Sequence, residues 1–156
     1  MTESDRSWLI RPATRADIPT ITALEQSSGT AAHWKPEQYA SLFRESSRRT
    51  VLVAEDKSSK CVQGFLVARN VAREWELENI VVSDESQRRG MGTRLLGELL
   101  DRAKNLGCES IFLEVRESNQ AARAFYDKLH FEQSGRRRNY YRGPDEDAIL
   151  YRLQLT

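Results

Sequence analysis

The feature that most constrains the fold is the segment 75–107, where a predicted strand, a turn with two glycines and an amphipathic helix follow one another. Residues 75–83 are predicted as the strand, and residues 90–106 as the clearest helix in the chain. Gly107 stands where a helix commonly ends. One face of the helix carries, at helical spacing, Met91, Leu95, Leu99, Ala103 and Leu106, and it is widened by Leu96 and Leu100. A strand that leads directly into such a helix is typical of a mixed α/β fold.

Periodicity elsewhere predicts strands and helices on both sides of this segment. Further strands are expected at residues 7–12, 50–55, 61–69, 110–115, 131–134 and 148–155. Helices are expected after Thr14, which has capping-box spacing with Asp17, and after Pro36, a residue common in first helical turns. Asn119 can cap a last helix that runs to residue 128. The resulting order of elements predicts a mixed α/β fold in one domain, residues 1–156.

The composition is ordinary for a globular domain. The chain is 39% hydrophobic and 30% charged, unlike a disordered chain. Its 24 Lys and Arg against 23 Asp and Glu give a formal net charge of +1, so the chain as a whole attracts neither nucleic acid nor an anionic membrane. No segment approaches the roughly 20 apolar residues of a membrane span. We expect a cytoplasmic protein with no direct nucleic-acid or membrane partner.

The cysteines and histidines indicate neither a metal site nor a covalent nucleophile. Cys61 and Cys108 show no C-x-x-C spacing, and both are expected to be buried free thiols. His33 and His130 form no triad with a Ser or Cys that spacing could identify. We therefore expect no bound metal.

The turn before the helix has the features of an anion site. Gly90 and Gly92 let a ligand approach the backbone, and the free N–H groups of a helix start carry the positive end of its dipole. Arg88 and Arg89 add positive charge. A plain tight turn explains the same residues equally well. Ordinary nucleotide folds are disfavoured, because the Lys of a Walker loop is missing and Leu95 occupies the third position of a G-x-G-x-x-G motif.

Glu114 is an acidic residue inside a predicted apolar strand. With strand alternation, Ile111, Leu113 and Val115 share one face, while Phe112 and Glu114 share the other. One interpretation is a solvent-facing Glu or a charge that protects an edge strand. The other is a general base that accepts a proton from an amine, directly or through water. The pattern alone leaves both open.

The run QRRGMG, residues 87–92, resembles the Q/R-x-x-G-x-G/A signature of GNAT acetyltransferases. The resemblance implies a central, mostly antiparallel twisted sheet, splayed at the acetyl-CoA site and flanked by about four helices. It implies that the pyrophosphate of acetyl-CoA is held by Arg88, Arg89, Gly90, Met91, Gly92 and Thr93. In that family the backbone of the preceding strand pairs with the pantetheine arm, a role that here falls to Ile80, Val81 and Val82.

A second run, LEVRESNQAA at residues 113–122 followed by FY at residues 125–126, is similar to the RimI group of bacterial GNAT enzymes. The resemblance implies that Glu114 is the general base, that Tyr126 protonates the departing CoA thiolate and that Asn119 contacts CoA. On pattern alone, Tyr126 would be a core residue with its hydroxyl at the rim. The RimI group acetylates the N-terminal alanine of a small-subunit ribosomal protein, so the implied acceptor is a protein N-terminus.

The similarity continues through RRNYY at residues 137–141 and EDA at residues 146–148. In GNAT N-terminal acetyltransferases the loop between the last two strands helps to form the peptide groove, which makes Tyr140 and Tyr141 the implied substrate contacts. Residues 136–138 would otherwise be a solvated run of charge. His130 departs from the family, which commonly has Gly there, and a left-handed backbone at this position would strain a His.

Two other functions are compatible with these residues. One is a GNAT enzyme for a small amine, an antibiotic or a lysine side chain, because the acetyl-CoA half of the site would be the same. The other is a non-catalytic module that binds acetyl-CoA or a partner, against which the presence of both Glu114 and Tyr126 argues. An N-terminal α-amine, with a pKa of about 7.7–8.0, is an easier acceptor than lysine at about 10.4.

Overall fold

The computed structural model describes residues 7–28, 34–44 and 48–155 of the 156-residue chain. Within these residues the elements follow the order predicted from the sequence. The strands are β1 (Trp8–Pro12), β2 (Arg49–Asp56), β3 (Val62–Val71), β4 (Glu74–Val82), β5 (Ser110–Arg116), β6 (Glu132–Tyr141) and β7 (Glu146–Gln154). The α-helices are α2 (Ile18–Ser27), α3 (Pro36–Ser41), α4 (Met91–Asn105) and α5 (Gln120–Lys128). Single 3-10 turns precede α2 and follow β4, at Arg15–Asp17 and Asp84–Ser86.

The strands of the described residues form one sheet in the order β1-β2-β3-β4-β5-β7-β6. Neighbouring strands are antiparallel except β4 and β5, which run parallel. A parallel pair needs a crossover connection, and α4 supplies it. The prediction of a mixed α/β fold with a mostly antiparallel sheet is confirmed.

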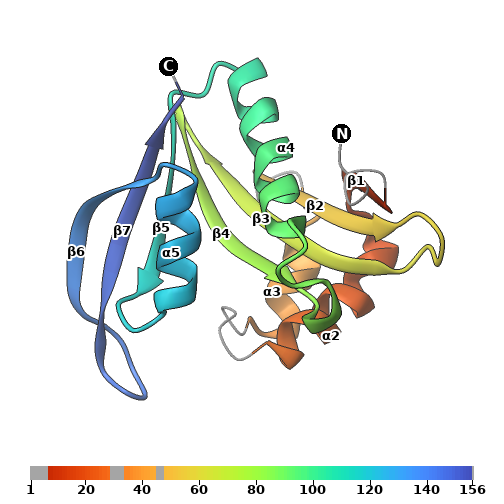
Figure 1. Cartoon of the computed structure of the whole chain (residues 1–156), viewed down its shortest axis with the longest axis horizontal. Helices are drawn as coiled ribbons and strands as arrows, with labels where there is room; N and C mark the ends of the chain where they lie inside the picture. The colour runs from red at the N-terminus through yellow and green to blue at the C-terminus, as the bar shows by residue number, and fades with distance from the viewer. Residues whose placement is uncertain (1–6, 29–33, 45–47, 156) are drawn as a thin grey trace.

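The sheet opens between β4 and β5 (Figure 1). The two strands pair only at Glu74 with Ser110, Trp75 with Ile111 and Glu76 with Phe112. Beyond these positions β4 stays paired with β3 on its other side, while β5 follows β7. Residues 77–82 therefore present a backbone edge that pairs with no strand of the described residues. The predicted splay of the sheet is confirmed.

Helices cover both faces of the sheet (Figure 1). Leu52 and Val53, successive residues of β2, belong to different buried clusters, because successive side chains point to opposite faces. Leu52 packs in the cluster of α4 and α5, whereas Val53 packs in the cluster of α2 and α3 with Ile21 and Tyr39. The side chains that α4 buries are Met91, Leu95, Leu96, Leu99 and Ala103.

A bulge in β4 changes which of its side chains faces each layer. Leu77 and Asn79 pair with adjacent residues of β3, so Glu78 is an extra residue in β4. Before the bulge, Leu77 packs against the α4 and α5 layer; after it, Val81 packs against the α2 and α3 layer. Asn79 is buried at the bulge, and its Nδ2 has no hydrogen-bond partner in the described part of the chain.

Two local predictions were wrong. Leu106 is 73% exposed, because α4 ends at Asn105 and the chain has already left the helical path there. Cys61 is exposed at the β2–β3 turn, since its hairpin position points to solvent. Cys108 is buried as predicted, with its Sγ 3.2 Å from the carbonyl oxygens of Arg73 and Ser110.

Strand β6 is much longer than the predicted strand at residues 131–134. It continues to Tyr141 as an edge strand, paired on one side with β7. Nearly all of its side chains are exposed, so it lacks the apolar alternation that marks a half-buried strand. Pairing with β7, rather than burial of side chains, places this segment in the sheet.

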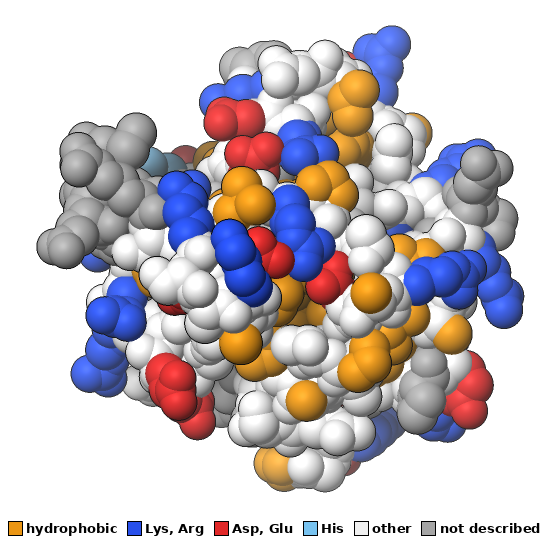
Figure 2. Space-filling view, turned by 90° about the vertical axis from the view of Figure 1, so that its right-hand side faces the viewer, with side chains coloured by type: hydrophobic (Ala, Val, Ile, Leu, Met, Phe, Trp, Pro, Cys, Tyr) orange, Lys and Arg blue, Asp and Glu red, His pale blue; other side chains and the backbone are white. Residues whose placement is uncertain are grey.

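The surface is mixed in charge. On the face shown in Figure 2, Lys and Arg side chains lie next to Asp and Glu side chains, and hydrophobic side chains gather in a hollow between them. This agrees with the formal net charge of +1.

Candidate active site

Helix α4 begins at an N-terminus that has no side-chain cap among the described residues. Its N-cap residue, Gly90, has a φ of +86°, a left-handed conformation that glycine adopts without strain. The first turn of α4 contains no acidic residue. The N–H groups of this turn have no intrahelical acceptor, and they carry the positive end of the helix dipole. The backbone therefore has the geometry of an anion site.

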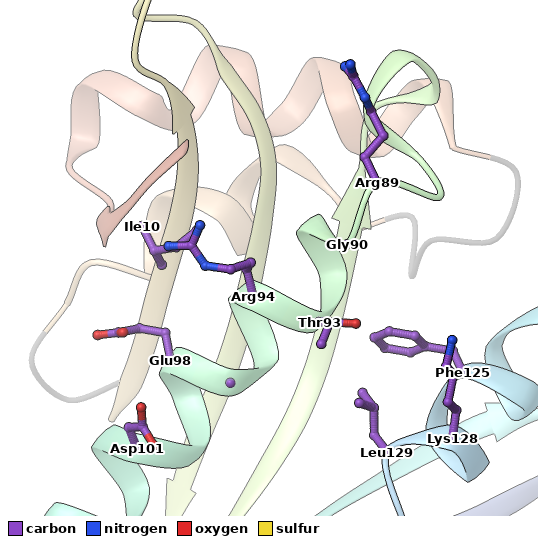
Figure 3. A pocket seen from close by; sticks show the side chains of 11 residues that line it. Ile10, Arg89, Gly90, Thr93, Arg94, Glu98, Asp101, Phe125, Lys128 and Leu129 are labelled. Carbon is purple, nitrogen blue, oxygen red and sulfur yellow. The ribbon is translucent and has the colours of Figure 1, made fainter. Parts of the chain in front are cut away.

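A cavity of about 590 Å³ runs along α4 beside α5 and β1 (Figure 3). Three of the predicted cofactor-binding residues line it: Arg89, Gly90 and Thr93. Thr93 of α4 and Phe125 of α5 face each other across the space between the helices (Figure 3). The rest of the lining is Ile10, Arg94, Gly97, Glu98, Asp101, Lys128 and Leu129.

The other predicted residues of the turn contribute in different ways. Met91 is buried in the core, so its side chain supports α4 and only its backbone faces the turn. Arg88 is exposed, adopts a φ of +63° and is not among the residues that line the cavity. At Gly92, a Cβ atom would lie 3.3 Å from Cζ of Phe125. Glycine at this position therefore lets α5 approach α4 closely.

The open edge of β4 contains the three residues predicted to pair with a ligand. Val81 is buried in the α2 and α3 cluster, while Ile80 and Val82 pack against the α4 and α5 cluster. Their other backbone edge pairs with β3. The Val82 carbonyl accepts a 3.3 Å hydrogen bond from Nε2 of Gln87, which ties the turn to the end of the strand.

Glu114 lies on the β5 face opposite to its buried neighbours. Leu113 and Val115 pack in the α4 and α5 cluster, so alternation directs Glu114 to the other face of the sheet. Its side chain is 14% exposed, and Oε1 lies 2.8 Å from Nε of Arg137 on β6. Glu114 is thus a half-buried carboxylate with a cationic partner, rather than a freely solvated surface charge.

Tyr126 lies on the α4 and α5 face, and it is only 6% exposed. Its ring contacts the rings of Phe125, Phe131 and Tyr151, with centroids 5.2, 5.5 and 6.1 Å away. Burial raises the pKa of its phenol, so the hydroxyl stays protonated at neutral pH. No hydrogen bond to that hydroxyl is found within the described residues. Tyr126 and Glu114 are not in contact; they flank β5 from opposite faces.

The sequence predicted that Tyr140 and Tyr141 lie in a loop. This prediction was wrong, because strand β6 extends through both residues. Their ring centroids are 5.1 Å apart, and Tyr140 is 50% exposed. Tyr141 is half-buried, with the Arg116 guanidinium 4.3 Å from its ring centroid. Burial and the nearby negative charge of Glu114 raise the pKa of Tyr141. Arg137 connects this aromatic pair to Glu114, because it pairs with the carboxylate and its Cζ lies 5.5 Å from the ring centroid of Tyr140.

Asn119 and His130 bound α5. The Oδ1 atom of Asn119 accepts a 3.1 Å hydrogen bond from the N–H of Ala122, so this side chain caps the helix as predicted. His130 has a φ of +70° at the C-terminal end, where helices commonly place glycine. His130, which stands where the GNAT family commonly has Gly, therefore has the left-handed backbone conformation that strains a His.

Comparison with known proteins now identifies the family. Residues 18–131 match the model of the acetyltransferase (GNAT) family. The chain belongs to the GNAT acetyltransferase family. It is therefore an acyltransferase of a family that takes its acetyl group from acetyl-CoA.

Relatives of this GNAT chain include bacterial enzymes named [ribosomal protein bS18]-alanine N-acetyltransferase. The enzyme from Escherichia coli K12 is 35% identical, and the match covers 90% of this chain and 93% of the relative. That from Haemophilus influenzae is 31% identical over 89% and 93% of the two chains. The crystal structure of the E. coli ribosomal-protein-S18-alanine N-acetyltransferase superposes with a TM-score of 0.83 at 33% identity, covering 96% of this chain and 94% of that one. These matches confirm the resemblance to the RimI group.

Three residues of the candidate site were not singled out from the sequence. Phe125 and Lys128 line the cavity, and a helical spacing of three residues could have indicated their shared face. Arg137 was assigned to a solvated charge run, yet it pairs with Glu114. No local pattern reports that contact, because it joins residues on different strands.

Within residues 7–28, 34–44 and 48–155, no group of three or more His, Cys, Asp or Glu is placed to hold a metal ion. No helix of these ranges has the length and apolar character needed to cross a membrane. His33 lies outside the described residues.

Proposed function

We propose that this chain, acting as a single domain, transfers the acetyl group of acetyl-CoA to the N-terminal alanine of a small-subunit ribosomal protein. The observation that carries the proposal is the gap between β4 and β5, because Glu114 lies on the part of β5 that no longer pairs with β4. The relatives named for this activity on bS18 support the choice of acceptor. A ribosomal acceptor also agrees with the expected cytoplasmic location.

The residues around the gap fit acetyl-CoA. In the proposed complex, the uncapped turn Arg88, Arg89, Gly90, Met91, Gly92 and Thr93 binds the pyrophosphate through backbone N–H groups and local positive charge. The free backbone edge at Ile80, Val81 and Val82 binds the amide groups of the pantetheine arm. The Nδ2 of Asn119, which has no partner within the described residues, supplies a further donor.

Direct transfer between the two bound substrates then needs only two side chains. Glu114 accepts the proton of the acceptor ammonium, and the free amine attacks the thioester carbonyl carbon. The new C–N bond forms as the C–S bond breaks, and Tyr126 donates its proton to the departing thiolate sulfur. The nitrogen loses its second proton through water to the Tyr126 phenolate, which restores the phenol, and Glu114 releases its proton to solvent. The products are the N-acetylated protein and CoA. Tyr140 and Tyr141, which Arg137 connects to Glu114, are proposed to contact the first residues of the acceptor.

The acceptor class can be tested with a panel of peptides that differ only in their first residue. We expect the alanine-first peptide to exceed a leucine-first peptide by about 10-fold or more in kcat/KM, because an acceptor site that selects alanine must exclude larger side chains. Free polyamines, an aminoglycoside and an N-blocked lysine peptide serve as competing acceptors. A preference for one of these would replace the proposed acceptor, and CoA binding without turnover on any of them would indicate a non-catalytic module.

The cofactor assignment predicts that Gly92→Asp weakens acetyl-CoA binding. The new carboxylate would stand near the expected phosphate oxygens, and like charges about 6 Å apart repel by roughly 3 kcal/mol at an effective dielectric constant near 20, or about 10²-fold in affinity. The contact with Phe125 adds a steric effect in the same direction. Calorimetric titration with acetyl-CoA measures the change.

Gly135→Asp is the matched control for this variant. Gly135 is exposed on β6 and does not line the cavity, and a Cβ atom there meets only Leu150, at ordinary contact distances of 3.8 and 3.9 Å. The control adds the same charge away from the N-terminal turn, so its loss of affinity should be much smaller. If the Gly92→Asp variant and the parent bind acetyl-CoA with equal affinity, the turn does not bind the pyrophosphate and the cofactor assignment is wrong.

A further inference from the structure

The carboxylate of Glu114 is covered by the side chain of Arg137. The Nε of Arg137 lies 2.8 Å from Oε1 of Glu114, and the two side chains are 56% and 14% exposed. The more exposed guanidinium thus lies on the outer side of the pair. It occupies the position from which a cation would reach this carboxylate.

The contact between Arg137 and Glu114 is built differently from the structural ion pairs of the same protein. Arg49 uses two nitrogen atoms to bond both oxygens of Glu78, at 2.7 and 3.1 Å. Arg136, the neighbour of Arg137, pairs with two carboxylates, those of Glu117 and Asp147. Arg137 pairs with the single carboxylate of Glu114, and within the described residues its guanidinium makes no bidentate hydrogen bonds of the kind that join Arg49 to Glu78.

Arg137 is the partner that can leave this pair at little cost. Its side chain is 56% exposed, and a guanidinium released to water is well solvated. When Arg137 swings away from Glu114, its guanidinium returns to water. The Tyr140 ring, whose centroid already lies 5.5 Å from its Cζ, is a further partner that it can keep. The less exposed carboxylate of Glu114 is the group that needs a replacement cation.

We infer that Arg137 is a positioning residue. In the free enzyme it pairs with Glu114 at the position that the acceptor ammonium will take, and the ammonium displaces it when the acceptor binds. The inference rests on the proposed function, in which Glu114 accepts the amine proton. One cation replaces another, so the carboxylate is never left unpaired. Acceptors with a positively charged amino group are selected at this step, since a neutral or blocked terminus cannot displace the guanidinium.

Steady-state kinetics of Arg137→Ala test the exchange. We expect the KM of the acceptor peptide to fall by about 2- to 5-fold, the range in which exposed ion pairs act, because the competing cation is gone. The kcat should change by less than the KM, and Arg137→Lys should restore the parent KM. Arg138→Ala removes the same charge from the same strand without touching Glu114, and should leave the KM unchanged.

Carboxyl labelling of the free enzyme gives a measurement that needs no acceptor. A water-soluble carbodiimide with glycine ethyl ester converts accessible carboxylates to amides, which peptide mass spectrometry locates. We expect Glu114 to be labelled several-fold faster in Arg137→Ala than in the parent or in Arg138→Ala.

The two measurements separate the inference from the function on which it rests. If the alanine-first peptide is not acetylated but labelling of Glu114 rises in Arg137→Ala, the acceptor assignment is wrong. The same result supports the inference that Arg137 shields the Glu114 carboxylate. Two results would overturn the inference while the peptide is still acetylated. A higher KM in Arg137→Ala would make Arg137 a substrate contact, and unchanged labelling of Glu114 would make the ion pair purely structural.

Discussion

Glu114→Gln is expected to lower turnover on an alanine-first peptide by about 10²–10⁴-fold, the range for loss of a general base. Glutamine keeps the size of the side chain and its hydrogen-bonding reach, but it cannot accept the amine proton. The affinity for acetyl-CoA should stay close to that of the parent, because Glu114 lies on the sheet face opposite to the α4 and α5 layer. Turnover at saturating acetyl-CoA and a separate calorimetric titration measure the two quantities.

The pH dependence of this variant distinguishes a base from a structural acid. With the base removed, only the ionisation of the acceptor amine, with a pKa of about 7.7–8.0, should control the rate between roughly pH 6 and pH 10. Part of the lost rate should return at the alkaline end, where the amine is already free. Glu117→Gln is the control, since it removes a nearby carboxylate that pairs with Arg136 instead. A wild-type rate and profile in Glu114→Gln would rule out the base assignment.

Tyr126→Phe is expected to reduce turnover by a similar factor, about 10²–10⁴-fold, if its hydroxyl protonates the departing thiolate. Phenylalanine keeps the ring contacts with Phe125, Phe131 and Tyr151. Because the hydroxyl has no hydrogen-bond partner within the described residues, its removal should change the free energy of unfolding by less than about 0.5 kcal/mol. Turnover and thermal unfolding are measured on the same preparation.

Tyr151→Phe is the control in the same aromatic cluster, since we expect it to lower stability and not turnover. The Tyr151 hydroxyl accepts hydrogen bonds from Nε of Arg123 at 3.1 Å and Nε2 of Gln133 at 3.5 Å. Its loss should cost about 1 kcal/mol of stability and leave turnover near that of the parent. If Tyr126→Phe retains full turnover, Tyr126 is a core residue and another group protonates the thiolate.

Much of the fold could be predicted because its signals are local. The stripe on α4 and the alternation in β5 depend on side chains a few residues apart, and both strands and helices follow the predicted order. Strand β6 could not be predicted to its full length, since its backbone pairing with β7 leaves no apolar pattern. The placement of Tyr140 and Tyr141 in a loop was wrong for the same reason.

The site could be predicted where it follows a short motif and not where it depends on packing. Gly90 and the uncapped start of α4 have the geometry that the glycine turn indicated. Whether the proposed residues bind acetyl-CoA stays a prediction. Phe125 reaches the cavity because α5 packs close to Gly92. Arg137 reaches Glu114 across the sheet. These distances depend on the assembled strands and helices, which no single stretch of sequence encodes.

The gap in the sheet also couples the folding of this protein to its ligand. Only three residue pairs join β4 to β5, so the β1–β4 half and the β5–β7 half share few backbone hydrogen bonds across that line. A ligand that pairs with the free edge of β4 supplies the missing bonds to the native state alone. By mass action, a ligand at 100 times its dissociation constant stabilises such a state by about 2.7 kcal/mol. The resistance of the chain to unfolding and proteolysis would then rise and fall with the cellular concentration of its acetyl donor.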